Sequence, residues 1–298
     1  MNTAFPHLGQ TLATVTAVTW AFAVILFKKS GESVHPVALN LFKNSLAAVL
    51  FLPTLWFFGE TLLRRAPASD YLLLMVSGAL GIGLSDTLFF MALNRLGAGL
   101  MAIVDCLYSP FIISLSVIFL SEHMTAWQFF GAGMILFGVL MAGVEKPKSG
   151  LIRKDLWLGI LFGILALAGM AVGIVMIKRL LERSPLLWVT EIRLMASVIA
   201  LLIILPLHPA RRTMMGSLLS AQGWRYTLSG SFVGAYLSMV FWLGGMKYTQ
   251  ASIAAALNQT SNIFVFIFAA LLLKEPVNRQ RVVAIVLAVG GALLVTLS

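Results

Sequence analysis

The sequence predicts an all-α polytopic membrane protein, with ten transmembrane helices arranged as two inverted five-helix repeats. First, 60% of the 298 residues are hydrophobic and only 11% are charged, whereas soluble domains carry about 25% charged residues. Second, apolar runs of about 20 residues recur along the chain, which is the length that a helix needs to cross a bilayer. Third, the second half of the chain repeats features of the first half.

The apolar runs are separated by short polar segments, which predicts antiparallel neighbours in sequence order. The most polar of these segments, residues 145–155, separates five runs from five others. The predicted spans are 8–27, 36–58, 71–93, 98–120, 126–144, 156–177, 186–207, 225–246, 250–273 and 280–297. Glycines in the fifth and tenth runs, among them Gly131, Gly133 and Gly291, would permit close approach of helices.

Two stretches of equal length show the repeat most clearly. Residues 77–95, "SGALGIGLSDTLFFMALNR", align with residues 229–247, "SGSFVGAYLSMVFWLGGMK", at a spacing of 152. In this alignment Ser238 stands where the first copy has Asp86. Repetition at a fixed spacing across a whole chain is stronger evidence than any single motif.

The repeat defines two units, residues 10–143 and 157–297, within one transmembrane body. Because each unit has five spans, the second must enter the membrane from the opposite side. Inverted repeats are typical of secondary transporters, in which the substrate site lies near the membrane midplane where the repeats meet. We therefore expect intramembrane polar residues to gather there.

Asp86 and Asp105 are the leading candidates for substrate binding or proton coupling. Asp86 lies nine residues before Arg95, at the turn between the third and fourth runs, and Asp105 lies ten residues after it. Both carboxyl groups should therefore lie at about the same depth on adjacent antiparallel helices. Ionisable groups inside a membrane usually face a cavity or a partner. The alternative is that both are neutral, or paired to satisfy packing.

Polar and aromatic residues of the central runs complete the candidate site. Tyr108 and Ser109 share a helix face with Asp105, and Asn258 corresponds to Asp105 in the second repeat. Aromatic residues could stack on a planar substrate, or could face lipid or pack. The further candidates for substrate binding or coupling are Trp20, Tyr108, Ser109, Tyr236, Ser238, Trp242, Asn258, Gln259 and Asn262.

Three other charged residues lie inside the predicted spans. Lys43 and Arg193 each follow a proline at a helix start by seven or eight residues. Their long side chains could reach the membrane surface, or could serve gating or contact with a substrate anion. Glu191 is closer to its helix end, which favours an interface or ion-pair residue.

Several classes of site are not expected. Cys106 is the single cysteine, which excludes an internal disulfide or a cysteine metal cluster. The common nucleotide-binding and hydrolase motifs are absent, so we expect no catalytic residues, metal or cofactor. The net charge of +10 comes from basic residues in short loops, which indicates membrane-surface anchors and no nucleic-acid partner. The start of the chain has no features of a removable signal peptide.

The ten runs, the five-plus-five repeat and a glutamate after the fourth and ninth runs ("FLSEHMT" with Glu122, "LLLKEPVN" with Glu275) resemble the EamA family of the drug/metabolite transporter superfamily. This resemblance implies transport of metabolites or amino acids across the inner membrane, often export, with both termini cytoplasmic. The distribution of Lys and Arg among the loops favours termini on the outside, so the orientation stays open.

These observations favour a secondary active transporter, and not an enzyme. We expect export of small metabolites or amino acids by alternating access, with a proton gradient as one possible driver beside uniport and exchange. The expected partners are a small-molecule solute, protons and the lipid bilayer, with a monomer as the functional unit. The alternatives are a membrane-embedded lipid-modifying enzyme or a passive channel. The substrate cannot be read from the sequence.

Overall fold

The computed structural model describes residues 7–120, 125–144, 153–219, 223–248 and 257–297, and these residues form helices without any strand. The helices of the first half are α1 (Leu8–Ser30), α2 (Pro36–Phe57), α3 (Ala68–Gly78), η1 (Ala79–Leu84), α4 (Ser85–Leu96), α5 (Ala98–Asp105), α6 (Tyr108–Leu120) and α7 (Ala126–Val144). Those of the second half are α8 (Arg153–Val175), α9 (Lys178–Arg183), α10 (Leu186–Leu207), α11 (Arg211–Leu219), α12 (Trp224–Gly230), η2 (Ser231–Leu237), α13 (Ser238–Tyr248), α15 (Ser261–Leu272) and α16 (Arg279–Leu297). The segments η1 and η2 are π-helical.

The helices have the length and composition of membrane spans. Among the described residues, six are long and apolar enough to cross a membrane, and three shorter apolar helices accompany them. The six are Leu8–Ser30, Pro36–Phe57, Ala68–Leu96, Arg153–Val175, Leu186–Leu207 and Trp224–Gly245, and the three are Ala98–Ile112, Ala126–Ala142 and Leu257–Leu272. The expectation of a multi-pass all-helical membrane protein is confirmed, while the count of ten crossings stays a prediction.

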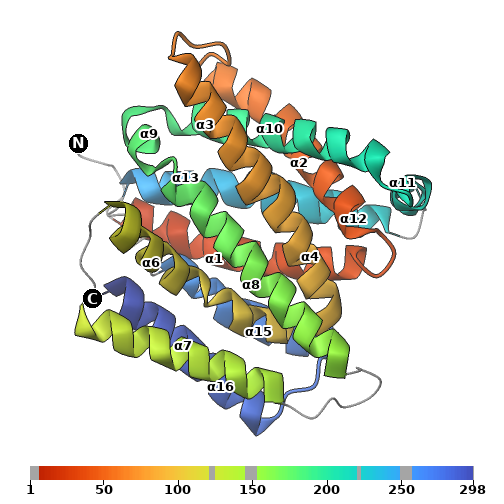
Figure 1. Cartoon of the computed structure of the whole chain (residues 1–298), viewed down its shortest axis with the longest axis vertical. Coiled ribbons are helices and arrows are strands. Elements are labelled where there is room, and N and C mark those ends of the chain that lie inside the picture. The colour runs from red at the N-terminus through yellow and green to blue at the C-terminus, as the bar shows by residue number, and fades with distance from the viewer. Residues whose placement is uncertain (1–6, 121–124, 145–152, 220–222, 249–256, 298) are drawn as a thin grey trace.

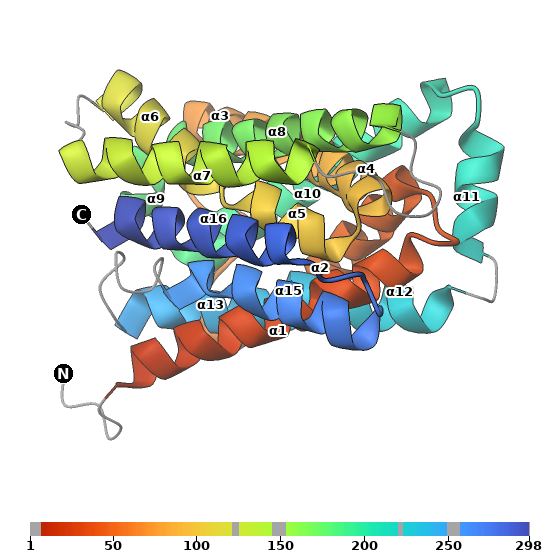
Figure 2. The ribbon, with the colours of Figure 1, turned by 90° about the horizontal axis from the view of Figure 1, so that it is seen from below.

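The two halves of the chain are interleaved. In Figure 1, α4 lies along α8, α7 along α16 and α2 along α10, and each of these pairs joins one half to the other. α1 likewise packs against α13 and α15. The start of α1 and the end of α16 lie at the same end of the bundle, and α11 lies across the opposite end (Figure 2). An even number of crossings requires this placement of the first and last helices.

Small residues bring α7 and α16 close together. A Cβ atom at Gly131 would lie 2.7 Å from the Gly291 carbonyl oxygen, and one at Gly291 would lie 2.5 Å from the Gly131 oxygen. Backbones at this distance leave no space for a side chain. Gly133, which is in the same helix, has no atom within 4 Å of its Cβ position, so it plays no part in the contact.

The helix predicted over residues 98–120 is interrupted after Asp105, so that the structure has α5 and α6 in its place. α5 ends at Asp105, and the Leu107 amide donates to the Val104 carbonyl at 2.9 Å in a tighter turn. Pro110 has no amide hydrogen and cannot bond to the carbonyl four residues earlier. The break therefore frees backbone carbonyls next to Asp105.

Each half contains one π-helical segment in the repeated stretch. The Ser85 hydroxyl donates to the Leu80 carbonyl at 2.8 Å, and the Ser238 hydroxyl donates to the Val233 carbonyl at 2.8 Å, five residues earlier in both cases. Ser238 therefore occupies the structural position of Ser85, and not that of Asp86. The extra residue of η2 relative to η1 shifts the alignment by one position. π-helical turns inside α-helices frequently mark functional sites.

Candidate functional site

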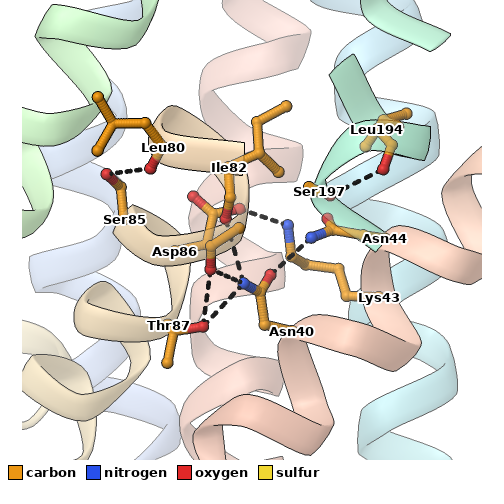
Figure 3. Close-up of polar contacts among 11 residues, drawn as sticks. Asn40, Lys43, Asn44, Leu80, Ile82, Ser85, Asp86, Thr87, Leu194 and Ser197 are labelled. Atoms are coloured by element: carbon orange, nitrogen blue, oxygen red, sulfur yellow. Dashed lines mark hydrogen bonds and ion pairs between the residues drawn. The ribbon is translucent and has the colours of Figure 1, made fainter. Parts of the chain in front are cut away.

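An ion pair between α2 and α4 lies in the interior of the bundle. Lys43 Nζ is 2.6 Å from Asp86 Oδ2, and the two side chains are only 8% and 19% exposed. Figure 3 shows both side chains pointing toward each other between the helices. Lys43 Nζ also lies 5.9 Å from the centre of the Phe90 ring. Lys43 is therefore an interior residue, and its side chain does not reach for the membrane surface.

Amide side chains of α2 extend this ion pair into a polar network with η1 (Figure 3). The Asn40 amide donates to the carbonyls of Ile82 and Gly83 at 3.1 and 2.8 Å, and to the Thr87 hydroxyl at 3.0 Å. Asn44 donates to the Asn40 side-chain oxygen at 2.9 Å. A π-helical segment shifts its backbone hydrogen bonds, and Asn40 supplies donors to two of its carbonyls. These bonds hold η1 and Thr87, the residue after Asp86, against α2.

Arg193 brings a second cation to the same region from α10. A Cβ at Gly81 of η1 would lie 3.4 Å from Arg193 Nη2, so the guanidinium rests against the backbone of this segment. Its charge interacts with Asp86 and Tyr108. No described residue forms a hydrogen bond with the buried Nε atom. The matched basic residues of both repeats thus approach the single carboxylate of Asp86.

Asp105 lies in a separate small cavity and does not meet Asp86. The cavity has a volume of about 10 Å³, which is space for about one water molecule. The Asn262 side chain interacts with Asp105 and lies 3.5 Å from Cys106 Sγ. The lining residues are Trp20, Val24, Phe89, Met101, Ala102, Asp105, Asn262 and Val265. At this size the cavity does not hold a metabolite, so the protein is closed around these side chains.

Tyr108 connects the two polar regions. It begins α6 directly after the break, and its hydroxyl is within electrostatic range of both Arg193 and Asp105. The neighbouring Ser109 accepts a hydrogen bond from the Gln259 amide, which also lies 3.3 Å from Asn262. The first and second repeats therefore meet at these polar groups. Asn258 is half-buried beside Gln259.

The other sequence candidates, Tyr236, Ser238 and Trp242, lie in η2 and α13 of the second repeat. The Ser238 hydroxyl lies 3.0 Å from the Thr19 hydroxyl of α1, and the Tyr236 hydroxyl lies 2.9 Å from the Thr54 hydroxyl of α2. Trp242 packs against an apolar cluster. These contacts join α13 and η2 to the first repeat, and they are distinct from the Asp86 and Asp105 regions.

Sequence reasoning missed Asn40 and Thr87. Asn40 lies three residues before Lys43 in an otherwise apolar run, and this spacing on one helix face was the available signal. Glu191 was expected to be an interface or ion-pair residue, and both of its buried carboxylate oxygens lack a hydrogen-bond partner among the described residues. No group of three potential metal ligands occurs in the described part of the chain.

Glu275, in the loop between α15 and α16, contacts the turn between α4 and α5. Its two carboxylate oxygens accept hydrogen bonds from the amides of Ala98 and Gly99 at 2.7 and 2.9 Å. These amides open α5, directly after Gly97 with a φ of 81°. A carboxylate at a helix N-terminus satisfies amides that have no partner within the helix. Glu122, the matching glutamate, lies outside the described residues.

Comparisons with known proteins identify relatives along the whole chain. The sequence model of the EamA-like transporter family matches residues 7–144 and 157–297. A protein of Archaeoglobus fulgidus named an uncharacterized transporter is 22% identical over 96% of this chain and 97% of its own length. One of Methanothermobacter thermautotrophicus with the same name is 24% identical over 94% of this chain and 84% of its own length.

One further relative was found by sequence and one by comparison of structures. A biotin transporter of Salmonella typhimurium is 29% identical over 59% of this chain and 55% of its own length. A solved crystal structure superimposes with a TM-score of 0.65 at 18% sequence identity, covering 96% of this chain and 98% of the other. At this identity the superposition shows the fold alone.

Proposed function

Because the chain belongs to the EamA-like transporter family, we propose that it is a secondary active transporter that exports a small metabolite or amino acid across the inner membrane. The solute would bind between the two repeats and reach either side by alternating access. Ten crossings in two inverted repeats, residues 10–143 and 157–297, would provide the two alternating halves. The pairing of helices from opposite halves supports this arrangement.

The observation that carries the proposal is the convergence of Lys43, Asp86 and Arg193 in the interior of an apolar bundle. Charged groups inside a membrane are costly, and they mark solute or ion pathways when they are retained. Lys43 and Asp86 belong to the first repeat and Arg193 to the second, so a relative movement of the repeats would change the distance between Arg193 and Asp86. Such a site would differ between the two states of a carrier, as alternating access requires.

Proton coupling would use Asp86, Asp105 or both. Asp105 is the stronger candidate because it faces a cavity and has no cationic partner among the described residues, whereas Asp86 is engaged by Lys43. Ionisable groups that face a cavity inside a membrane commonly belong to proton relays in transporters. Uniport or exchange would instead leave transport independent of the pH gradient.

The proposal is tested with purified protein in sealed proteoliposomes. We expect saturable movement of a small organic solute, faster when a pH gradient is imposed. Asp105→Asn should abolish the effect of the gradient, and the double variant Lys43→Gln with Asp86→Asn tests the other carboxylate without leaving Lys43 unpaired. Unchanged gradient-driven transport in both variants would refute the coupling role.

The same preparation separates the alternatives. A passive channel would give flux that does not saturate and that exceeds carrier turnover. A lipid-modifying enzyme would form a product in detergent, where no compartments exist. Neither result is compatible with the proposed carrier.

A further inference from the structure

We propose that Arg193, beside the Lys43–Asp86 ion pair, is the binding site for a carboxylate group of the transported solute. This inference names the substrate class of the site described above, and it therefore rests on the proposed function. The solute would be an organic acid or an amino acid whose carboxylate binds the guanidinium.

The charges at this place do not cancel. Lys43 and Arg193 contribute two positive charges, and Asp86 contributes one negative charge, so the cluster has an excess of one positive charge. A buried charge without a partner is strongly destabilising. A single carboxylate would neutralise the cluster, whereas a neutral or cationic solute would not.

Glu191 does not supply the missing negative charge. It lies two residues before Arg193 on α10, and side chains at this spacing point to different sides of a helix. Both carboxylate oxygens of Glu191 lack a hydrogen-bond partner among the described residues, so Glu191 accepts no hydrogen bond from Arg193. The excess charge at Arg193 is therefore not offset along its own helix.

Asp86 does not satisfy Arg193 either. Its Oδ2 atom is held by Lys43 Nζ at 2.6 Å, and the buried Nε atom of Arg193 has no hydrogen-bond partner among the described residues. Lys43 and Arg193 therefore have different roles despite their matched positions in the repeats. Lys43 is already paired, while Arg193 keeps its planar set of N–H donors for another group.

The guanidinium has the chemistry for this ligand. Its donors match the two oxygens of a carboxylate, which gives paired hydrogen bonds and discriminates against a single-oxygen acceptor. Gly81 leaves the guanidinium close to the η1 backbone, so a carboxylate bound at Arg193 would lie beside this π-helical segment.

The first test measures thermal stabilisation of the full-length protein in detergent by matched pairs of compounds. Each pair consists of a carboxylate and its neutral amide: biotin and biotinamide, phenylacetate and phenylacetamide, and several amino acids with their amides. We expect at least one carboxylate to raise the melting temperature, as a ligand of the folded state does, and its amide to bind at least tenfold more weakly.

The second test uses variants of Arg193. Arg193→Gln should weaken binding of the stabilising carboxylate at least tenfold, and Arg193→Lys should recover part of it. In the absence of ligand Arg193→Gln should leave the melting temperature unchanged or raise it, because it removes a partly buried charge whose Nε atom has no partner among the described residues. A purely structural arginine would show the opposite, a lower melting temperature. Arg225→Gln, at an exposed position on α12, is the matched control and should change neither quantity.

The outcomes separate this inference from the proposed function. Equal binding of an acid and its amide, unchanged binding in Arg193→Gln, or stabilisation only by neutral compounds would overturn the carboxylate site. Failure of every carboxylate to bind would also overturn it. If proteoliposomes move neutral solutes while Arg193→Gln has no effect, the transporter stands and the carboxylate site falls. If they move no solute at all, the proposed function falls.

Discussion

Lys43 on α2 and Asp86 on α4 form an ion pair of 2.6 Å inside an apolar bundle. The same two positions belong to a sequence repeat in which the basic residue recurs, as Arg193, and the carboxylate does not. The structure accounts for this asymmetry. Lys43 of the first repeat and Arg193 of the second both lie near Asp86, so a single carboxylate interacts with the basic residues of both repeats. The second repeat therefore needs no carboxylate of its own at the position that corresponds to Asp86.

The first prediction concerns the strength of this pair. Asp86→Asn should lower the free energy of unfolding by about 3–5 kcal/mol, because it leaves Lys43 buried without a counter-charge. The double variant with Lys43→Gln should recover most of this loss. Thermal unfolding in detergent measures both, and Glu32→Gln, which breaks the exposed Lys29–Glu32 pair, should change stability by less than about 1 kcal/mol. A double variant as unstable as Asp86→Asn alone would contradict the pairing.

The second prediction concerns the support of η1 by Asn40. Asn40→Leu removes the donors to Ile82 and Gly83 and should cost about 1–3 kcal/mol, the penalty for unsatisfied buried groups. The change should also lower transport, because η1 is the segment against which Arg193 rests. Melting temperature and solute uptake are the measurements. An unchanged melting temperature and unchanged solute uptake would show that η1 keeps its structure without the hydrogen bonds from Asn40.

The third prediction uses two glycines of one helix. Gly131→Leu should destabilise the protein by about 1–3 kcal/mol through overpacking, because its backbone meets Gly291 of α16. Gly133→Leu in the same helix has open space at its Cβ position and serves as the control. Equal melting temperatures for the two variants would mean that α7 and α16 are farther apart than described.

The fourth prediction concerns the carboxylate of Glu275 at the start of α5. Glu275→Ala should speed hydrogen exchange of the Ala98 and Gly99 amides and cost about 0.5–2 kcal/mol, as the loss of a helix N-cap does. The Leu39 amide, which is bonded to the His35 carbonyl, should exchange as before. Unchanged exchange at Ala98 and Gly99 would exclude the capping role.

The fifth prediction concerns pH and His35, in the loop before α2. Burial lowers the pKa of His35 below its usual value of 6.5, and the nearby His208 adds to the effect. The unfolded chain therefore binds this proton more readily, so the stabilisation is present above pH 6.5 and is lost as the pH falls. Its Nδ1 atom also accepts the Val37 amide at the helix start.

His35→Asn keeps a capping side chain but cannot titrate in this range. Between pH 8 and pH 5 the melting temperature of the natural protein should fall more than that of the variant. If the melting temperatures of the two proteins fall equally with pH, the pKa of His35 is the same in the folded and unfolded chain, and the prediction is wrong.

The apolar helices could be predicted from the sequence because their composition alone determines them. The run at 126–144 has the same bounds as α7, and the run at 186–207 the same as α10. The break before Tyr108 was not predicted, because a proline inside a membrane helix, here Pro110, can either kink or end it. The π-helical segments have no compositional signal, and they caused the one-residue error that aligned Ser238 with Asp86.

The position of Asp86 deep in an apolar run predicted it as a candidate site residue, but did not predict that its partner is Lys43. Depth placed Asp86 and Asp105 at the same level, whereas rotation about the helix axes directs Asp86 to Lys43 and Asp105 to Asn262. Rotation of each helix depends on packing between elements distant in sequence, which a single sequence does not specify. The same reason explains why the unpaired state of Arg193 became visible only in the structure.

The most direct test of the account is counterflow in sealed proteoliposomes, with the solute that gives the largest thermal stabilisation. Vesicles loaded with unlabelled solute should transiently accumulate labelled solute above its external concentration, and Arg193→Gln should abolish the accumulation. Labelled solute that only equilibrates, at the same rate with or without internal solute, would contradict a carrier that alternates between two sides.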